Sequence, residues 1–184
     1  MKNAGQCPVF SYIIKNWIYI MSKLIVLSGV PGSGKSYFSK LLRKKKAGHV
    51  YVVSSDSLRD MVTGSQRNLS EEQLIWKMYY ELAKVYADDP RGIVILDATN
   101  IIVKHRVDAV RDLKPYFNEV DLVLFDVPKD VVMRQNLERE FPVPEVVLEE
   151  YFEAFQLPQK EDYEFFHNVY ITNGDNVKDI VNLI

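Results

Sequence analysis

Short apolar runs alternate along the chain with longer stretches in which apolar residues recur at helical spacing. The runs are rich in valine, isoleucine and leucine, and they cover residues 24–27, 50–53, 93–96, 120–125 and 168–172. A run that is apolar at every position is typical of a strand buried on both faces, as in a parallel sheet. The alternation therefore predicts a three-layer α/β fold, with a five-stranded parallel sheet and helices on both faces.

Helices are predicted between these strands, at residues 37–46, 57–61, 70–87, 103–113, 128–139 and 145–155, with a short one after Asp175. Ser70 and Gln73 have the spacing of a capping box, and Asp175 is expected to cap the last helix. The cations at residues 43–46 suit a helix C-terminus, and Gly48 is expected to end that helix. The pattern contains neither a repeat nor a linker, so residues 21–184 are expected to form one domain.

A glycine-rich turn joins the first predicted strand to the first predicted helix. Residues 29–36 match the pattern G-x-x-x-x-G-K-[ST] at every fixed position, and the glycines fall at Gly29, Gly32 and Gly34. Between a strand and a helix, such a turn wraps a polyphosphate with its backbone N–H groups and with the helix N-terminus. We expect Gly29, Gly32, Ser33 and Gly34 to form this cradle. A turn without a ligand is the disfavoured alternative.

Two side chains at the end of this turn predict nucleoside triphosphate chemistry. Lys35 is expected to reach the β- and γ-phosphates of ATP, and the Ser36 hydroxyl is expected to ligate Mg²⁺. This motif alone does not separate a kinase from other enzymes or switches that bind a triphosphate. Transfer to an alcohol also needs a base, cations on the migrating group and exclusion of water.

Asp56 is the candidate for the base. It follows the second predicted strand, at the edge of a parallel sheet where ligands bind, and Arg59 follows one helical turn later. The pair would suit an acceptor that carries a phosphate ester, with Asp56 taking the hydroxyl proton and Arg59 holding the phosphate. The alternative is that Asp56 caps the helix and Arg59 is a surface residue.

A further carboxylate, Asp97, ends the third predicted strand, as in a Walker B element. It could hold Mg²⁺ through water or contact the acceptor. Thr99 and Asn100 offer a hydroxyl and an amide to the same cleft, and turn formation is an equally favoured role for both.

Arg134 and Arg139 lie on either side of the predicted end of the helix at residues 128–139. We expect Arg139 to cover the triphosphate as part of a lid, and Arg134 also to bind the nucleotide. An ion pair between Arg134 and Glu138, four residues apart, is the alternative. Residues 104–106 are cationic and are expected to form a solvated helix face.

The amino-acid composition limits which partners and which cellular location are expected. Apolar residues make up 47% of the 184, enough for a core, and the net charge of −2 means that any polyanion site must be local. Cys7 is the only cysteine, so no internal disulfide is expected and a cytoplasmic location fits. Residues 1–20 are expected to be an extension or a mis-assigned start, with Met21 as the true start. Their apolar stretch is too short to span a membrane.

From about Ser22 to Phe155 the chain resembles the kinase domain of phage-type polynucleotide 5′-kinases, within the P-loop kinases. The matching stretches are residues 29–36, Asp56-Ser57-Leu58-Arg59, Asp97-Ala98-Thr99-Asn100, residues 125–128, residues 136–139 and Val143-Pro144. The resemblance implies that Lys35 and Ser36 bind ATP and Mg²⁺, that Asp56 is the general base, that Arg59 holds the acceptor strand and that Arg139 is the lid arginine. Ala98 stands where the family carries an aspartate.

We therefore predict ATP-dependent transfer of the γ-phosphoryl group to a hydroxyl, with the 5′-hydroxyl of DNA or RNA as the favoured acceptor. Two alternatives remain open. One is a P-loop kinase that acts on a small alcohol or a nucleoside, and the other is an ATP-binding switch module without kinase activity. No stable protein partner is predicted.

Overall fold

The computed structural model describes residues 22–184; the expected extension at residues 1–20 and the expected start at Met21 lie outside this part. Its sheet has five strands in the order β2-β3-β1-β4-β5, and every neighbouring pair is parallel. The strands are β1 (Lys23–Ser28), β2 (Val50–Ser54), β3 (Ile93–Asp97), β4 (Glu119–Phe125) and β5 (Asn168–Thr172). Each contains one of the predicted apolar runs, so the predicted fold class is confirmed.

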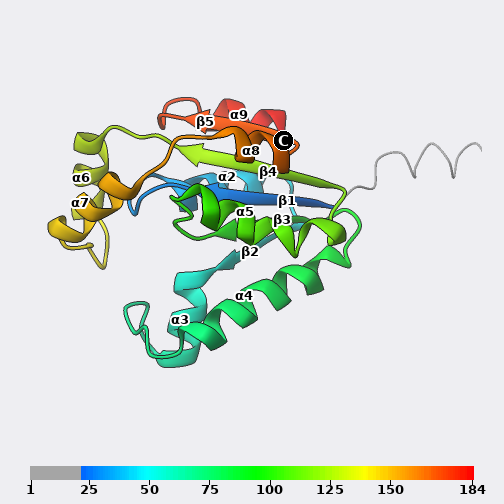
Figure 1. Ribbon diagram of the computed structural model, residues 1–184, viewed down its shortest axis with the longest axis horizontal. Helices are drawn as coiled ribbons and strands as arrows, with labels where there is room; N and C mark the ends of the chain where they lie inside the picture. Colours follow the sequence, from blue (N-terminus) through cyan, green and yellow to red (C-terminus); the bar gives the residue numbers. More distant parts are fainter. Residues whose placement is uncertain (1–21) are drawn as a thin grey trace, which may run out of the picture.

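Helices cover both faces of the sheet (Figure 1). One face packs against α3 (Ser55–Thr63), α4 (Glu72–Ala87), α5 (Val103–Arg111) and the end of α8 (Lys160–Phe165). The other packs against α2 (Lys35–Lys45), α6 (Lys129–Leu137) and α9 (Val177–Leu183). Figure 1 shows α7 (Glu145–Ala154) beside α6, beyond the carboxyl ends of the strands, and a short 3₁₀ helix, η1 (Lys114–Tyr116), precedes β4.

The central strand explains why the apolar runs show no alternation. In β1, Leu24 and Val26 point into one core and Ile25 and Leu27 into the other, and all four are fully buried. Burying such a side chain contributes about 1.5–3 kcal/mol to folding, so both faces of the strand must be apolar.

The position of the site follows from the connections. β1 lies next to β3, yet the chain leaves β1 for α2 on one face of the sheet and leaves β3 for α5 on the other. Two neighbouring strands whose following helices diverge leave a crevice at their carboxyl ends, which is where open α/β sheets bind ligands. The glycine-rich turn and Asp97 both lie at this edge.

Several predicted helix ends are wrong in detail. α4 begins at Glu72 after Glu71, without a side-chain cap, because Asn68 Oδ1 instead binds the N–H of Ser70 in a tight turn. α9 begins at Val177 after Asn176, and no side chain caps it. The predicted caps at Ser70 and Asp175 are therefore not formed.

The last turns of two predicted helices also differ. α5 stops at Arg111 and is followed by η1, whereas the prediction extended it to residue 113. α6 stops at Leu137, two residues before Arg139. Local sequence signals fix helix ends poorly because tertiary contacts decide which turn closes last.

Candidate active site

The glycine-rich turn is built so that only glycine fits at its first position. A Cβ atom at Gly29 would lie 2.7 Å from Ser33 Oγ and 2.9 Å from Phe125 Cβ. Gly32 and Gly34 have φ angles of 85° and 97°, which side chains strongly disfavour. Gly34 is the N-cap of α2 and no side chain caps this end, so the first N–H groups of the helix are free for an anion.

Lys35 points back onto the turn. Its Nζ donates hydrogen bonds to the carbonyl oxygens of Gly29 at 2.7 Å and Val30 at 2.9 Å. Burial lowers the pKa of Lys35 to about 8; the charge of Asp97 opposes this shift, and that of Arg139 adds to it. The Ser33 hydroxyl is also buried and has no hydrogen-bond partner within residues 22–184. The turn thus holds a cation and a polar group that a polyphosphate would satisfy.

Ser36 and Asp97 supply oxygen atoms beside this turn. Ser36 Oγ donates a hydrogen bond to Asp97 Oδ2 at 3.4 Å, which joins the start of α2 to the end of β3. Burial raises the pKa of Asp97, and the charge of Lys35 opposes the shift. Nowhere in residues 22–184 do three His, Cys, Asp or Glu side chains gather as metal ligands. One hydroxyl and one carboxylate fit Mg²⁺, which takes its other ligands from phosphates and water.

Asp56 stands in the first turn of α3 but does not cap it. Ser54 is the N-cap, and its hydroxyl accepts a hydrogen bond from the N–H of Ser57 at 3.3 Å. The Asp56 side chain is 53% exposed, and its charge contributes to raising the pKa of both Lys35 and Asp97. Asp56 is therefore open to solvent and close enough to the glycine-rich turn to act on its charged groups.

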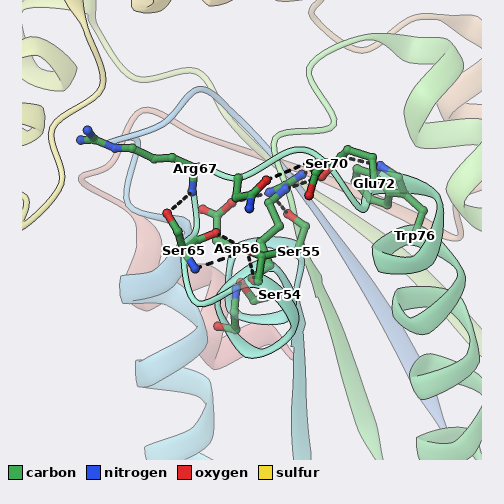
Figure 2. Close-up of polar contacts among 12 residues, drawn as sticks. Ser54, Ser55, Asp56, Ser65, Arg67, Ser70, Glu72 and Trp76 are labelled. Atoms are coloured by element: carbon green, nitrogen blue, oxygen red, sulfur yellow. Dashed lines mark hydrogen bonds and ion pairs between the residues drawn. The ribbon is translucent and has the colours of Figure 1, made fainter.

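Arg59 is fixed by two carboxylates rather than lying free on the surface. Its Nη1 donates to Asp56 Oδ1 at 2.7 Å, while Nε and Nη2 donate to the two oxygens of Glu72 at 2.6 and 3.1 Å. The hydrogen bonds between Arg59 and Glu72 raise the pKa of the arginine and lower that of the glutamate. Trp76 Nε1 donates to Glu72 Oε2 at 3.0 Å, and Figure 2 shows this network running from Asp56 to Trp76.

Sequence reasoning missed Glu72, because nothing local marks it. It lies 13 residues after Arg59, across an irregular loop, and only the folding of α4 against α3 brings the two together. The weak signal available was the pair of acidic residues, Glu71 and Glu72, at the start of an amphipathic helix.

The segment after β3, which contains Thr99 and Asn100, is hydrogen-bonded to the end of β1 and to the first residue of the glycine-rich turn. The N–H of Gly29 donates to the Thr99 carbonyl oxygen at 2.8 Å, and Asn100 Nδ2 donates to the Leu27 carbonyl oxygen at 2.9 Å. Asn100 is buried and has a φ of 43°, and its side-chain amide is engaged in this hydrogen bond within the protein. That these residues contact an acceptor stays a prediction.

Arg134 lies in α6, the helix whose Val132 packs against Gly32 of the turn, and Arg139 comes two residues after that helix. Arg134 is exposed on the last turn of α6; Arg139 is partly buried, and its charge influences the pKa of Lys35 and Asp97. Within the described chain neither arginine forms an ion pair, so the alternative pair with Glu138 is not formed. We call residues 138–144 the lid loop.

Asn136, which sequence reasoning also missed, closes the lid loop. Its Nδ2 donates to the Val143 carbonyl oxygen at 2.8 Å, and its Oδ1 accepts from the Val143 N–H at 2.9 Å. The preceding helix rests on the glycine-rich turn, since a Cβ at Gly32 would lie 3.2 Å from the Val132 carbonyl oxygen. The position of the lid loop is thus set by the turn that it would cover.

Arg106 contradicts the prediction of a solvated helix face. It is fully buried and donates to both oxygens of Asp162, at 2.8 and 2.7 Å, and to the carbonyl oxygens of Ile101 and Gln156. A buried arginine needs such a complete set of acceptors. The pair anchors α8, which was not predicted, against α5 near the Asn100 turn.

Comparisons with known proteins agree with this architecture. A family model described as an AAA domain (AAA_33) matches residues 24–158. L-seryl-tRNA(Sec) kinase of Methanococcus maripaludis is 27% identical over 144 residues, which are 73% of this chain and 53% of that protein. The chain therefore spans about half the length of this curated relative.

Two solved structures share the fold. A chain of the Pnkp1/Rnl/Hen1 RNA repair complex has a TM-score of 0.65 and 25% identity, with 83% of this chain and 48% of that chain covered. A gluconokinase from Sinorhizobium meliloti 1021 has a TM-score of 0.58 and 19% identity, with 89% of both chains covered. Among residues 22–184 no helix is both long enough and apolar enough to cross a membrane.

Proposed function

The chain belongs to the AAA domain family, and from this membership and the geometry of its site we infer that it is an ATP-dependent kinase. We propose that it transfers the γ-phosphoryl group of ATP to a hydroxyl, and that the acceptor is the 5′-hydroxyl of DNA or RNA. One observation carries the proposal: Ser54 pairs with Asp97 at the carboxyl ends of β2 and β3, which places the exposed Asp56 carboxylate, two residues later, at the same edge of the sheet as the Ser36–Asp97 pair.

The glycine-rich turn, residues 29–36, and Asp97 would bind the nucleotide. The uncapped N–H groups of α2 would hold the triphosphate, and Lys35 would exchange its two carbonyl partners for phosphate oxygens. Ser36 and Asp97 would hold Mg²⁺, which supplies positive charge to the β- and γ-phosphates when bound.

The chemical step would use the exposed carboxylate on α3. The acceptor oxygen attacks the γ-phosphorus, the bond from that phosphorus to the β–γ bridging oxygen breaks, and ADP leaves. The acceptor proton passes to the Asp56 carboxylate. Lys35 and Arg139 would offset the charge that develops on the transferred group, while the lid loop excludes water.

The proposed acceptor has its own support. Arg59 lies beside Asp56, and by exchanging its bond to Asp56 for a phosphate oxygen it would hold the acceptor next to the reacting hydroxyl and leave the Asp56 carboxylate free. The RNA repair complex and the seryl-tRNA kinase are proteins whose names concern RNA, whereas the gluconokinase is named for a small acceptor. A small-molecule kinase therefore remains the rival within the same chemistry.

A transfer assay with γ-labelled ATP tests the proposal. The protein is incubated in parallel with 5′-hydroxyl DNA and RNA oligonucleotides, nucleosides, gluconate and seryl-tRNA, and Lys35→Ala serves as the inactive control. Label on an oligonucleotide supports the proposal, and label on a small acceptor alone replaces the acceptor that we propose. Release of free phosphate alone would leave only the switch module and overturn kinase activity.

A further inference from the structure

Two loops that are distant in sequence meet beside the candidate active site: the α3–α4 loop, residues 64–71, and the lid loop. Arg67 Nη2 donates a hydrogen bond to the Pro142 carbonyl oxygen at 3.0 Å, and its guanidinium carbon lies 5.7 Å from the centre of the Phe141 ring. In Figure 2 the Arg67 side chain extends away from the Asp56 and Glu72 network. An arginine and an aromatic ring are thus held together where the two sides of the site meet.

Both partners are positioned by residues already described. The α3–α4 loop runs between Arg59 and Glu72, whose bidentate pair fixes its two ends. The lid loop is closed by the double hydrogen bond of Asn136 to Val143. The contact between Arg67 and Phe141 therefore joins two segments that are each anchored by residues of the candidate site.

The surroundings of this contact are unusual for a surface that faces only water. Phe141 is 50% exposed, and Leu137 and Leu69, one in or beside each loop, are 77% and 63% exposed. Arg67 supplies positive charge at this contact, and the lid loop carries one further cation, Arg139, between Glu138 and Glu140. Proteins commonly bind single-stranded nucleic acid with aromatic side chains and arginines. Bases stack on aromatic rings and on guanidinium groups, and arginines also attract the anionic phosphate backbone.

We propose that Arg67 and Phe141 form a subsite that stacks the 5′-terminal base of a single-stranded acceptor, so that its hydroxyl reaches Asp56. This inference rests on the proposed nucleic-acid kinase function. The same contact could instead act only as a latch that holds the lid loop over ATP. The two roles predict different results when the contact is removed: loss of a stacking subsite raises the KM for the acceptor, whereas loss of a latch raises the KM for ATP.

Steady-state kinetics on Phe141→Ala, Phe141→Trp and Arg67→Ala separate the roles, with Tyr116→Ala and Arg91→Ala as matched exposed controls on other surfaces. We expect Phe141→Ala and Arg67→Ala to raise the KM for a 5′-hydroxyl trinucleotide about tenfold, a usual effect of losing one stacked base. The KM for ATP should stay within about twofold, and Phe141→Trp should keep the wild-type values.

An acceptor whose 5′-terminal nucleotide is abasic provides the sharpest comparison. The wild-type protein should lose about tenfold in KM with it, and Phe141→Ala should then cause no further loss, because both changes remove one contact. Additive losses, or a rise in the KM for ATP as large as that for the trinucleotide, would overturn the stacking role. If the wild-type protein labels no oligonucleotide, the proposed acceptor fails and this subsite falls with it; unchanged variants of an active kinase refute the subsite alone.

Discussion

The floor of the candidate site and its rim are built in opposite ways. The floor is one continuous stretch, residues 29–36, which joins β1 to α2, is partly buried and is shaped by its own glycines. The rim joins α3, the start of α4 and the lid loop, and contacts between residues far apart in sequence hold it together. The difference teaches that the proposed phosphate-binding turn is encoded by one local stretch, whereas the proposed acceptor site depends on contacts that form only in the assembled fold.

The largest expected effect comes from the floor. Lys35→Ala should lower kcat/KM by about 10³-fold or more, since it removes a cation from the ground-state phosphates and from the developing charge. ATP affinity, measured by titration calorimetry, should fall as well. Lys40→Ala, on the same helix and exposed, should leave both unchanged. Normal ATP affinity in Lys35→Ala would erase the distinction between floor and rim.

The next effect comes from the rim, where removal of the Asp56 carboxylate should act mainly on the chemical step. Asp56→Ala should lower kcat by about 10²–10³-fold, the usual contribution of a general base. The affinity for ATP should stay within about twofold, because Asp56 touches none of the phosphate cradle. Asp60→Ala, one turn further along α3, is the control. Ordinary turnover in Asp56→Ala would show that another group takes the proton.

A smaller effect should follow from loss of the residue that positions Arg59. Glu72→Gln should raise the KM for the acceptor about tenfold, because one charged oxygen of the bidentate pair is lost and Arg59 can turn further toward Asp56. Kinetics with ATP and acceptor varied separately check this. Equal effects on both substrates would mean that Glu72 only stabilises the fold.

The smallest expected effect is the uptake of protons when ATP binds. Because burial lowers the pKa of Lys35 to about 8, this side chain is about half charged at pH 8 and charged at pH 6.5. Phosphates favour the charged form, so ATP binding should take up about half a proton at pH 8 and almost none at pH 6.5. Calorimetry in two buffers of different ionisation enthalpy measures this uptake, and Lys35→Met should abolish it.

The sequence predicted the parts of the molecule that local rules determine. The strands follow from runs such as residues 93–96, and the meeting of Ser36 with Asp97 follows from parallel strands ending at one edge. Glu72 and Asn136 could not be predicted, because each acts through a partner that only tertiary packing supplies. The pair of Arg106 and Asp162 was missed for the same reason, since charged residues are expected on the surface.

The double hydrogen bond of Asn136 to Val143 fixes both ends of the segment between them, residues 137–142. Its length and composition can change while α6 and α7 keep their places, much as a surface loop tolerates insertion. In such a scaffold the residues of this stretch other than Arg139 could be exchanged to suit a different acceptor, while the glycine-rich turn at residues 29–36 stays as it is.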